Sequence, residues 1–293
     1  MSAIVEQATE AAAPEPAGRA RRRTRRSVSL GIGLVLVGLV VIVAVVSFVW
    51  LPYAQSDTSG TRLEHPSGAH WLGTDRFGRD LLTQLMIGAR IALAVGLGSV
   101  AIGAVVGVTL GMLAAFATKW LDDTLSAVLD ILIAFPTLLL AMLIVAAQGA
   151  SLGTAIVAIG LAMSAVVARL TRVLAKRVLA QQYVTAARTS GTSWWGIVAR
   201  HILPNIWPTL SVNLALQFGV AVLAEASLSY LGLGTPPPNA SWGRMLQEAQ
   251  GTVSTAPVGA IAPGVALVIL VIGVNLVADG LRDVADPTRR RSR

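Results

Sequence analysis

Six apolar runs, each long enough to cross a bilayer, constrain the fold of this 293-residue chain more than any other feature. A run of about 20 apolar residues crosses the hydrocarbon core as a helix, because a helix bonds its own backbone N–H and C=O groups. The sequence is 54% hydrophobic and only 13% charged, too little charge to cover a soluble domain of this size. It predicts an all-α integral membrane protein with six transmembrane helices, near residues 28–50, 91–115, 125–146, 152–173, 207–226 and 260–277.

The basic residues around these runs predict the orientation of the chain. The sequence RARRRTRR (19–26) precedes the first run, which is longer than the roughly 7–15 apolar residues of a signal peptide. Of the 23 Lys and Arg residues, eighteen fall in the segments on one side of the membrane and five on the other, so the basic side is cytoplasmic. Both termini are then cytoplasmic, and the chain divides into a disordered basic tail (1–27), a first transmembrane helix (28–50), an outer segment (51–84), a five-helix core (85–281) and a second basic tail (282–293).

Several kinds of chemistry are excluded by the residues themselves. There is no Cys, the three His lack metal-binding spacing, and neither Lys119 nor Lys176 stands in a phosphate-binding GxxxxGK[ST] loop. We therefore expect a chain that is not an enzyme, with no metal, no cofactor and no ATP hydrolysis of its own. The net charge of +8 would suit nucleic acid, but the Arg residues flank apolar runs instead of forming one face, so no nucleic-acid partner is expected.

Polar side chains inside the runs are the places where a transporter could handle cargo or ions. Their carboxylates lie toward the ends of the runs, which argues against proton or sodium coupling and favours helix–helix hydrogen bonds. Arg90 and Glu225 both fall near the outer face, and we expect them to pair. Gly103, Gly107 and Gly111 share one helix face, which favours packing inside the chain over a contact between subunits. The intramembrane polar candidates are Arg90, Asn213, Gln217, Glu225, Asn275 and Asp279.

The one long inner loop contains a polar, small-residue segment, YVTAARTSGTSWWGIVARHILPN (183–205). Its first residues predict a short helix whose small side chains, Ala186 and Ala187, let another protein approach closely. Gly191 can adopt positive φ and end that helix. A second helix is expected over 194–203, capped by the Thr-Ser pair before it and restricted at its end by Pro204. A polar connector would need none of this spacing, so the segment is interpreted as a docking element.

The pattern T-A-A-x3-G-x9-H-I-L-P in this segment resembles the EAA loop of ABC importer permeases. The chain is also similar, along almost its full length from Arg23, to the second permease of the dipeptide, oligopeptide and nickel importers. Four further motifs carry this resemblance in the right order: HWLGTDRFGRDLLTQLMIGARIAL (70–93), DILIAFPTLLLAM (130–142), EASLSYLGLG…PPNASWGRML (225–246) and NLVADGLRDVADP (275–287). The resemblance implies the type I importer permease fold, with the EAA-like loop at 183–204.

In that family the loop forms a coupling helix that docks into a groove on the ATPase subunit. The resemblance assigns this contact to Tyr183, Val184, Thr185, Ala186, Ala187, Arg188, Gly191, Leu203 and Pro204. The family usually has Glu where this chain has Thr185, so no ionic contact is expected there, and Arg188 becomes the charge that faces the partner. In the outer segment, the resemblance implies that Gly73, Thr74, Asp75, Gly78, Arg79 and Asp80 bear on the binding protein and the outer gate.

The resemblance implies a permease subunit of a binding-protein-dependent importer in the bacterial cytoplasmic membrane. Its expected partners are a homologous permease, two ATPase subunits (or one fused ATPase) holding ATP and Mg²⁺, an extracytoplasmic binding protein and the lipid bilayer. The expected cargo is a di- or oligopeptide; nickel chelates, glutathione and haem are the alternatives. A self-sufficient secondary transporter and a membrane enzyme or receptor subunit are the rival classes, and the absence of midplane carboxylates and of a catalytic constellation argues against them.

Overall fold

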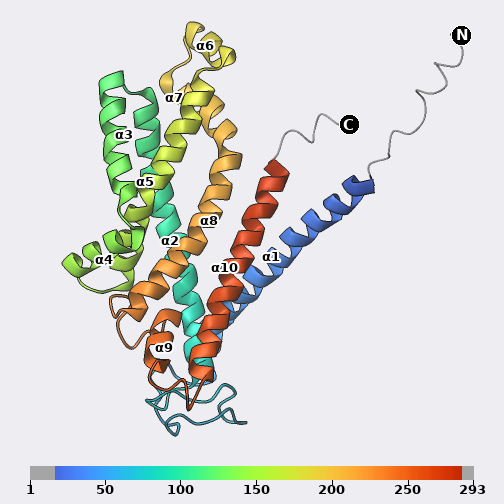
Figure 1. Cartoon of the computed structure of the whole chain (residues 1–293), viewed down its shortest axis with the longest axis vertical. Helices are drawn as coiled ribbons and strands as arrows, with labels where there is room; N and C mark the ends of the chain where they lie inside the picture. The colour runs from blue at the N-terminus through green and yellow to red at the C-terminus, as the bar shows by residue number, and fades with distance from the viewer. Residues whose placement is uncertain (1–16, 286–293) are drawn as a thin grey trace, which may run out of the picture.

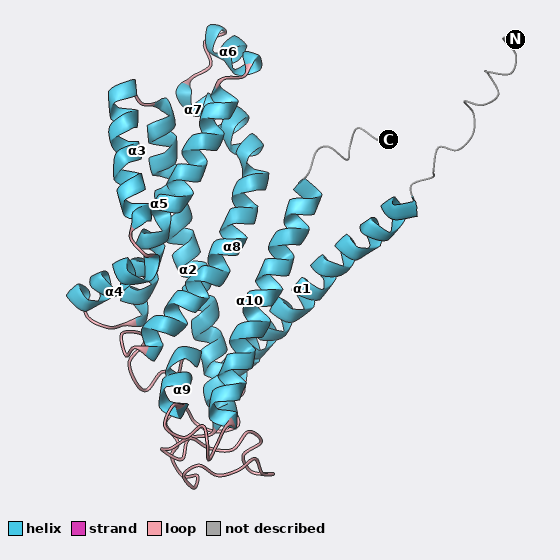
Figure 2. Ribbon diagram, in the orientation of Figure 1, coloured by secondary structure: helices cyan, strands magenta, loops and turns pink. Residues whose placement is uncertain are grey.

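The computed structural model describes residues 17–285, and their regular structure is almost entirely helical (Figure 1). Figure 2 shows the same helices joined by loops. Among the described residues the β-type pairing is an isolated bridge between Thr74 and Asp80. The helices are α1 (Ala17–Val49), α2 (Leu81–Phe116), α3 (Lys119–Ala134), α4 (Thr137–Gln148), α5 (Leu152–Leu179), α6 (Gln182–Thr189), α7 (Trp194–Ile197), the π-helical η1 (Val198–Ile202), α8 (Leu203–Tyr230), α9 (Trp242–Ala249) and α10 (Val258–Ala285).

Five stretches of helix in the described part are long and apolar enough to cross a membrane, and α3 and α4 together would make a sixth if the bent pair is one span. The predicted third span (125–146) is therefore wrong as a single helix. Instead α3 ends at Ala134, α4 begins at Thr137, and the two helices are bent by 89°. Pro136 explains the break, because it has no N–H to donate and holds Phe135 in an extended conformation (φ −76°, ψ 132°).

The glycine face of α2 packs against α5, so the prediction of packing inside the chain is confirmed. A Cβ atom on Gly107 would lie 2.6 Å from Cβ of Val167 and 2.7 Å from the carbonyl oxygen of Ser164. On Gly111 it would lie 2.5 Å from the carbonyl oxygen of Ala168. Glycine is needed here because any side chain would force the two helix backbones apart.

α1 packs along α10, and both helices extend beyond the predicted apolar runs. α1 begins at Ala17, so the predicted disordered tail is helical from that residue onward. Ala and Arg are good helix formers, which lets the membrane helix continue through the basic run. α10 continues to Ala285, so residues 282–285 of the second predicted tail are helical. This stretch contains neither Pro nor Gly to end the helix. The remaining parts of the two predicted tails, 1–16 and 286–293, lie outside the described residues.

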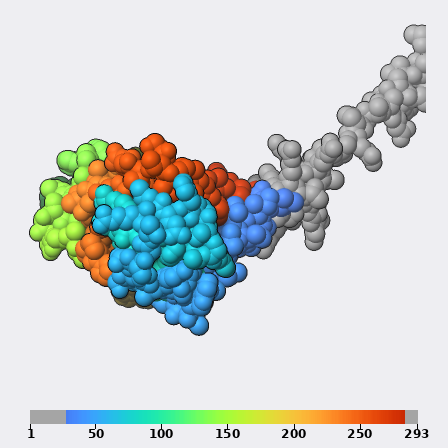
Figure 3. Space-filling view, turned by 90° about the horizontal axis from the view of Figure 1, so that it is seen from below, coloured from blue at the N-terminus to red at the C-terminus, as the bar shows by residue number. Residues whose placement is uncertain are grey.

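The two ends of the bundle carry different elements (Figure 1). α6 stands at one end, where α1 begins and α10 finishes. α9 and the segment between α1 and α2 lie at the other end, and Figure 3 shows that segment spread over it. Between the ends, large apolar side chains such as Val35, Val105 and Leu143 are exposed, as expected of helices that face lipid.

Candidate functional site

α6 ends in a tight turn centred on Gly191, as the sequence predicts. The N–H of Thr192 donates to the carbonyl of Ala187 (3.0 Å), and the N–H of Gly191 donates to the carbonyl of Arg188 (3.0 Å). These two bonds define a Schellman motif, in which the residue after the helix adopts a left-handed conformation. Gly191 has φ +81°, which a residue without Cβ adopts at little cost.

A single buried side chain anchors α6 to the transmembrane helices. Val184 is 0% exposed and belongs to an apolar cluster with Met112 of α2 and Ala175 of α5. The same cluster includes Ile197, Val198, Ile202 and Ile206 from α7 to α8. The other side chains of the predicted coupling helix are exposed or, for Ala187, half-buried. A movement of α6 would therefore be transmitted to α2, α5 and α8 through the side chains packed in this cluster.

The second half of the segment departs from the predicted 194–203 helix. Ser193 caps the helix start, accepting a bond from the N–H of Gly196 (3.3 Å). The helix then passes through the wider π turn of η1 and continues into α8, so Pro204 does not end it. Because Pro204 has no N–H, it can sit only where the regular i→i−4 pattern is interrupted, and the π turn provides that place. Leu203 is half-buried against the cluster, and Pro204 is exposed.

Aromatic and cationic side chains surround the base of α6. The guanidinium of Arg188 lies 5.9 Å from the centre of the Phe116 ring, and Trp194 meets the same ring edge-on. Arg188, Phe116, Trp194 and Lys176 line one hollow between α6 and the ends of α2 and α5. Thr185 and Ala186 lie exposed on α6. The arrangement can present a short helix with a small-residue face to a groove on another protein.

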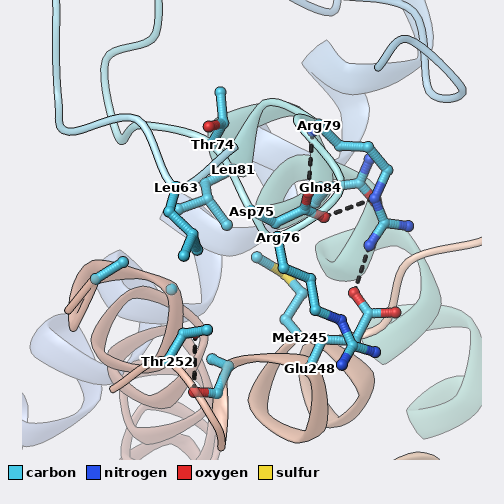
Figure 4. A pocket seen from close by; sticks show the side chains of 13 residues that line it. Leu63, Thr74, Asp75, Arg76, Arg79, Leu81, Gln84, Met245, Glu248 and Thr252 are labelled. Atoms are coloured by element: carbon cyan, nitrogen blue, oxygen red, sulfur yellow. Dashed lines mark hydrogen bonds and ion pairs between the residues drawn. The ribbon is translucent and has the colours of Figure 1, made fainter. Parts of the chain in front are cut away.

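At the opposite end, Asp75 organises the predicted outer residues into a tight loop (Figure 4). Its carboxylate accepts bonds from the backbone N–H of Phe77 (2.7 Å) and of Arg79 (2.9 Å), and from Nε of Arg79 (2.6 Å). The guanidinium of Arg79 also bonds Glu248 of α9, whose second oxygen accepts from Nε of Arg244 (2.9 Å). A chain of ion pairs thus ties the outer segment to α9.

The remaining predicted outer residues hold this segment together rather than facing out. Asp80 caps α2, accepting from the N–H of Thr83 (2.7 Å), and its other oxygen contacts Nδ1 of His70 (3.0 Å). Thr74 hydrogen-bonds the chain at residues 61 and 64. Gly73 and Gly78, both at positive φ, let that chain pass closely. Within residues 70–80 the exposed side chains are instead Trp71, Arg76 and Phe77. The sequence analysis did not select them, although Trp71 has the character of an interfacial residue.

The expected pair of Arg90 and Glu225 is not formed. The guanidinium of Arg90 bonds the hydroxyl of Ser47 and lies 4.2 Å from the Phe48 ring centre, both on α1. Glu225 is buried and accepts a hydrogen bond from the hydroxyl of Ser229 (2.6 Å) on its own helix. Similar depth in the membrane did not imply contact, because the two side chains point to different helices.

The other intramembrane candidates do not gather into one site. Asn213 and Gln217 lie on α8, and Oδ1 of Asn213 is buried without a hydrogen-bond partner in the described part of the chain. Asn275 of α10 approaches α8 near Gly219, and Asp279 is exposed farther along α10. Within residues 17–285, no group of three or more His, Cys, Asp or Glu side chains could hold a metal ion.

A buried carboxylate that the sequence analysis missed links α3 to α5. Asp122 receives Nε and Nη2 of Arg172 in a two-point contact (2.6 and 2.9 Å), and Nζ of Lys176 bonds it as well. Its position in the first turn of α3, where the helix dipole favours an acid, was the available sequence signal. The three charges join α3 to the part of α5 that leads into α6.

Comparison with known proteins agrees with this architecture. A family model described as "Binding-protein-dependent transport system inner membrane component" matches residues 107–291. The chain belongs to this family. It is a permease component of a binding-protein-dependent ABC importer, and such a component is a multi-pass translocation subunit of the inner membrane.

Named relatives of this permease are similar over most of its length. It is 39% identical to the glutathione transport system permease protein GsiD of Pectobacterium atrosepticum over 256 residues, 85% of each chain. It is 37% identical to the dipeptide transport system permease protein DppC of Alkalihalophilus pseudofirmus, over 85% of this chain and 84% of that one. A putative peptide transport system permease of Brucella suis is 40% identical over the same shares.

The solved structures include a permease of the same fold. An inward-facing form of the MetNI methionine ABC transporter matches with a TM-score of 0.59 at 22% identity, covering 69% of this chain and 96% of that chain. This likeness shows the type I importer permease fold.

Proposed function

We propose that this permease forms, with a homologous permease, the translocation pathway of an importer for di- or oligopeptides. ATP hydrolysis takes place on partner ATPase subunits, which hold ATP and Mg²⁺, and an extracytoplasmic binding protein delivers the cargo. The observation that carries the proposal is α6, a short exposed helix with one buried anchor, Val184, in the cluster where α2, α5 and α8 meet. Glutathione, nickel chelates and haem are the alternative cargoes within the same machinery.

The proposed mechanism is alternating access driven through α6. Docking can drive transport only if α6 binds the open and the closed ATPase pair with different free energies. Tyr183, Thr185, Ala186 and Arg188 lie on the exposed surface that would touch the ATPase. Movement of α6 would pass through the Val184 cluster and tilt the helices of the core, residues 85–281, around the cavity shared with the second permease.

The proposed orientation places α6 and both chain termini in the cytoplasm of a bacterium. In support, α6 lies at the end of the bundle where α1 begins and α10 finishes (Figure 1). The outer segment and α9 then face the binding protein. Trp71, Arg76 and Phe77 would make the contact, while Asp75, Arg79 and Asp80 would keep the segment rigid.

The test is uptake of a labelled dipeptide by proteoliposomes that contain the complex, with binding protein on one side and ATP on the other. We expect uptake to require both and to survive dissipation of ion gradients. Replacing Ala187 with Trp should abolish uptake and reduce the amount of ATPase purified with the permease, because the bulky ring blocks close approach. Uptake by this chain alone, driven by an ion gradient, would instead establish a secondary transporter.

A further inference from the structure

The stretch that surrounds α6 contains no acidic residue. No Asp or Glu occurs between Ile131 and Ala224, whereas this stretch has six basic residues: Arg169, Arg172, Lys176, Arg177, Arg188 and Arg200. The positive-inside rule accounts for the Lys and Arg, but it places no constraint on Asp and Glu. Burial in the membrane explains the absence of acids from the spanning helices. It does not explain why the connecting segment 174–205 also has none.

The structure divides these six cations into two groups. Four of them lie on α5, and three of these four have an acidic partner on α3. Asp122 binds Arg172 and Lys176, and Asp130 lies 3.5 Å from Arg169. The other three cations are exposed. Arg177 lies in the last turn of α5, Arg188 on α6 and Arg200 on η1. None of them has an ion-pair partner among residues 17–285. Within this stretch, the cations without an acidic partner lie on α6 and on the helix ends that precede and follow it in the sequence.

Arg188 is positioned rather than freely extended. Its guanidinium lies over the Phe116 ring, and it lines the hollow with Lys176 and Trp194. The Phe116 ring covers one flat face of the guanidinium. The N–H groups point outward from its edges, so they remain available to bind a planar anion. A guanidinium held against an aromatic ring in this way can bind a carboxylate through its edge.

α6 is poorly suited to a lipid surface. A helix that lies in the membrane interface needs an exposed apolar face. In α6 the aliphatic anchor Val184 is turned inward, and the exposed side chains are small or polar apart from Tyr183. A protein groove is therefore the better partner for this cationic surface.

We propose that the surface which receives α6 is acidic and that a carboxylate of the ATPase subunit pairs with Arg188. This inference rests on the proposed function, in which α6 docks on that subunit. Opposite charges across the contact would set the register of docking and select the cognate ATPase over a basic one.

The experiment measures how much ATPase subunit is retained when the tagged permease complex is purified from proteoliposomes. Arg188→Glu should reduce retention by at least about tenfold, and Arg188→Gln by less. Lys119→Glu, the same charge change at an exposed cytoplasmic-side residue of α3, should leave it unchanged. Thr185→Glu should also reduce retention, because it adds an acid beside Arg188, whereas Thr185→Gln should not.

Three results would overturn the proposal. The first is wild-type retention in Arg188→Glu. The second is stronger retention in Thr185→Glu, which would mean a basic groove. The third is a loss in Arg188→Glu that occurs in vesicles containing phosphatidylglycerol and disappears in pure phosphatidylcholine, which would assign Arg188 to lipid headgroups. If the wild-type permease retains no ATPase at all, the proposed function itself fails.

Discussion

Val184→Ala is expected to weaken the attachment of α6 to the membrane helices without unfolding them. Val184 is 0% exposed and is the buried side chain of α6. The substitution removes two buried carbons, at about 0.8 kcal/mol each, and leaves a small cavity, which together cost about 2 kcal/mol. Because α6 has no other deep contact, this cost falls on its local opening and raises the open population about thirtyfold.

Hydrogen–deuterium exchange measures this opening directly. Amides of 182–189 should exchange about thirtyfold faster in Val184→Ala, while those of α2 and α5 keep their wild-type rates. Val173→Ala is the matched control, since it makes the same chemical change at a partly exposed position of α5. Unchanged exchange in α6 would refute the anchoring role, and faster exchange throughout the chain would show that Val184 stabilises the whole bundle.

Three further substitutions test other contacts. Gly107→Leu should lower the melting temperature of the purified permease, at a cost of about 1–3 kcal/mol or more, because α5 lies within contact of its Cβ; Gly38→Leu, with nothing within 4 Å, should not. Asp122→Asn should lower the free energy of unfolding by about 2 kcal/mol, since Arg172 and Lys176 lose their carboxylate partner. The control Asp123→Asn, at an exposed position, should leave the melting temperature unchanged. Glu248→Ala should free the outer segment from α9 and speed limited proteolysis within 51–80, while the exposed Gln247→Ala leaves the rate unchanged; equal rates would mean that the ion pairs do not hold the segment.

Local physical rules were enough to predict several features. A backbone in hydrocarbon must satisfy its own hydrogen bonds, so apolar runs of sufficient length had to become helices. Gly191 was predicted to end α6 because a left-handed turn favours glycine there, and its φ of +81° agrees. The glycine face of α2 was recognisable because residues four apart share a helix face.

Proline was harder to interpret from its position alone. Pro136 breaks a span by 89°, whereas Pro204 and Pro208 lie within the helix that runs from α7 into α8. The difference depends on whether neighbouring turns can rearrange, as η1 does, and that is decided by the helices packed around them.

The sequence by itself determined the membrane-spanning helical architecture and the small-residue turn at Gly191, since each follows from interactions within a few residues. Only the tertiary structure decided which distant side chains meet. Arg90 contacts α1 instead of Glu225, Arg79 reaches α9, and Asp122 neutralises α5. The depth of a side chain in the membrane limits its possible partners to those at the same depth. Which of them it meets depends on the direction of the side chain around its helix and on how neighbouring helices cross. Both arise from packing over the whole bundle.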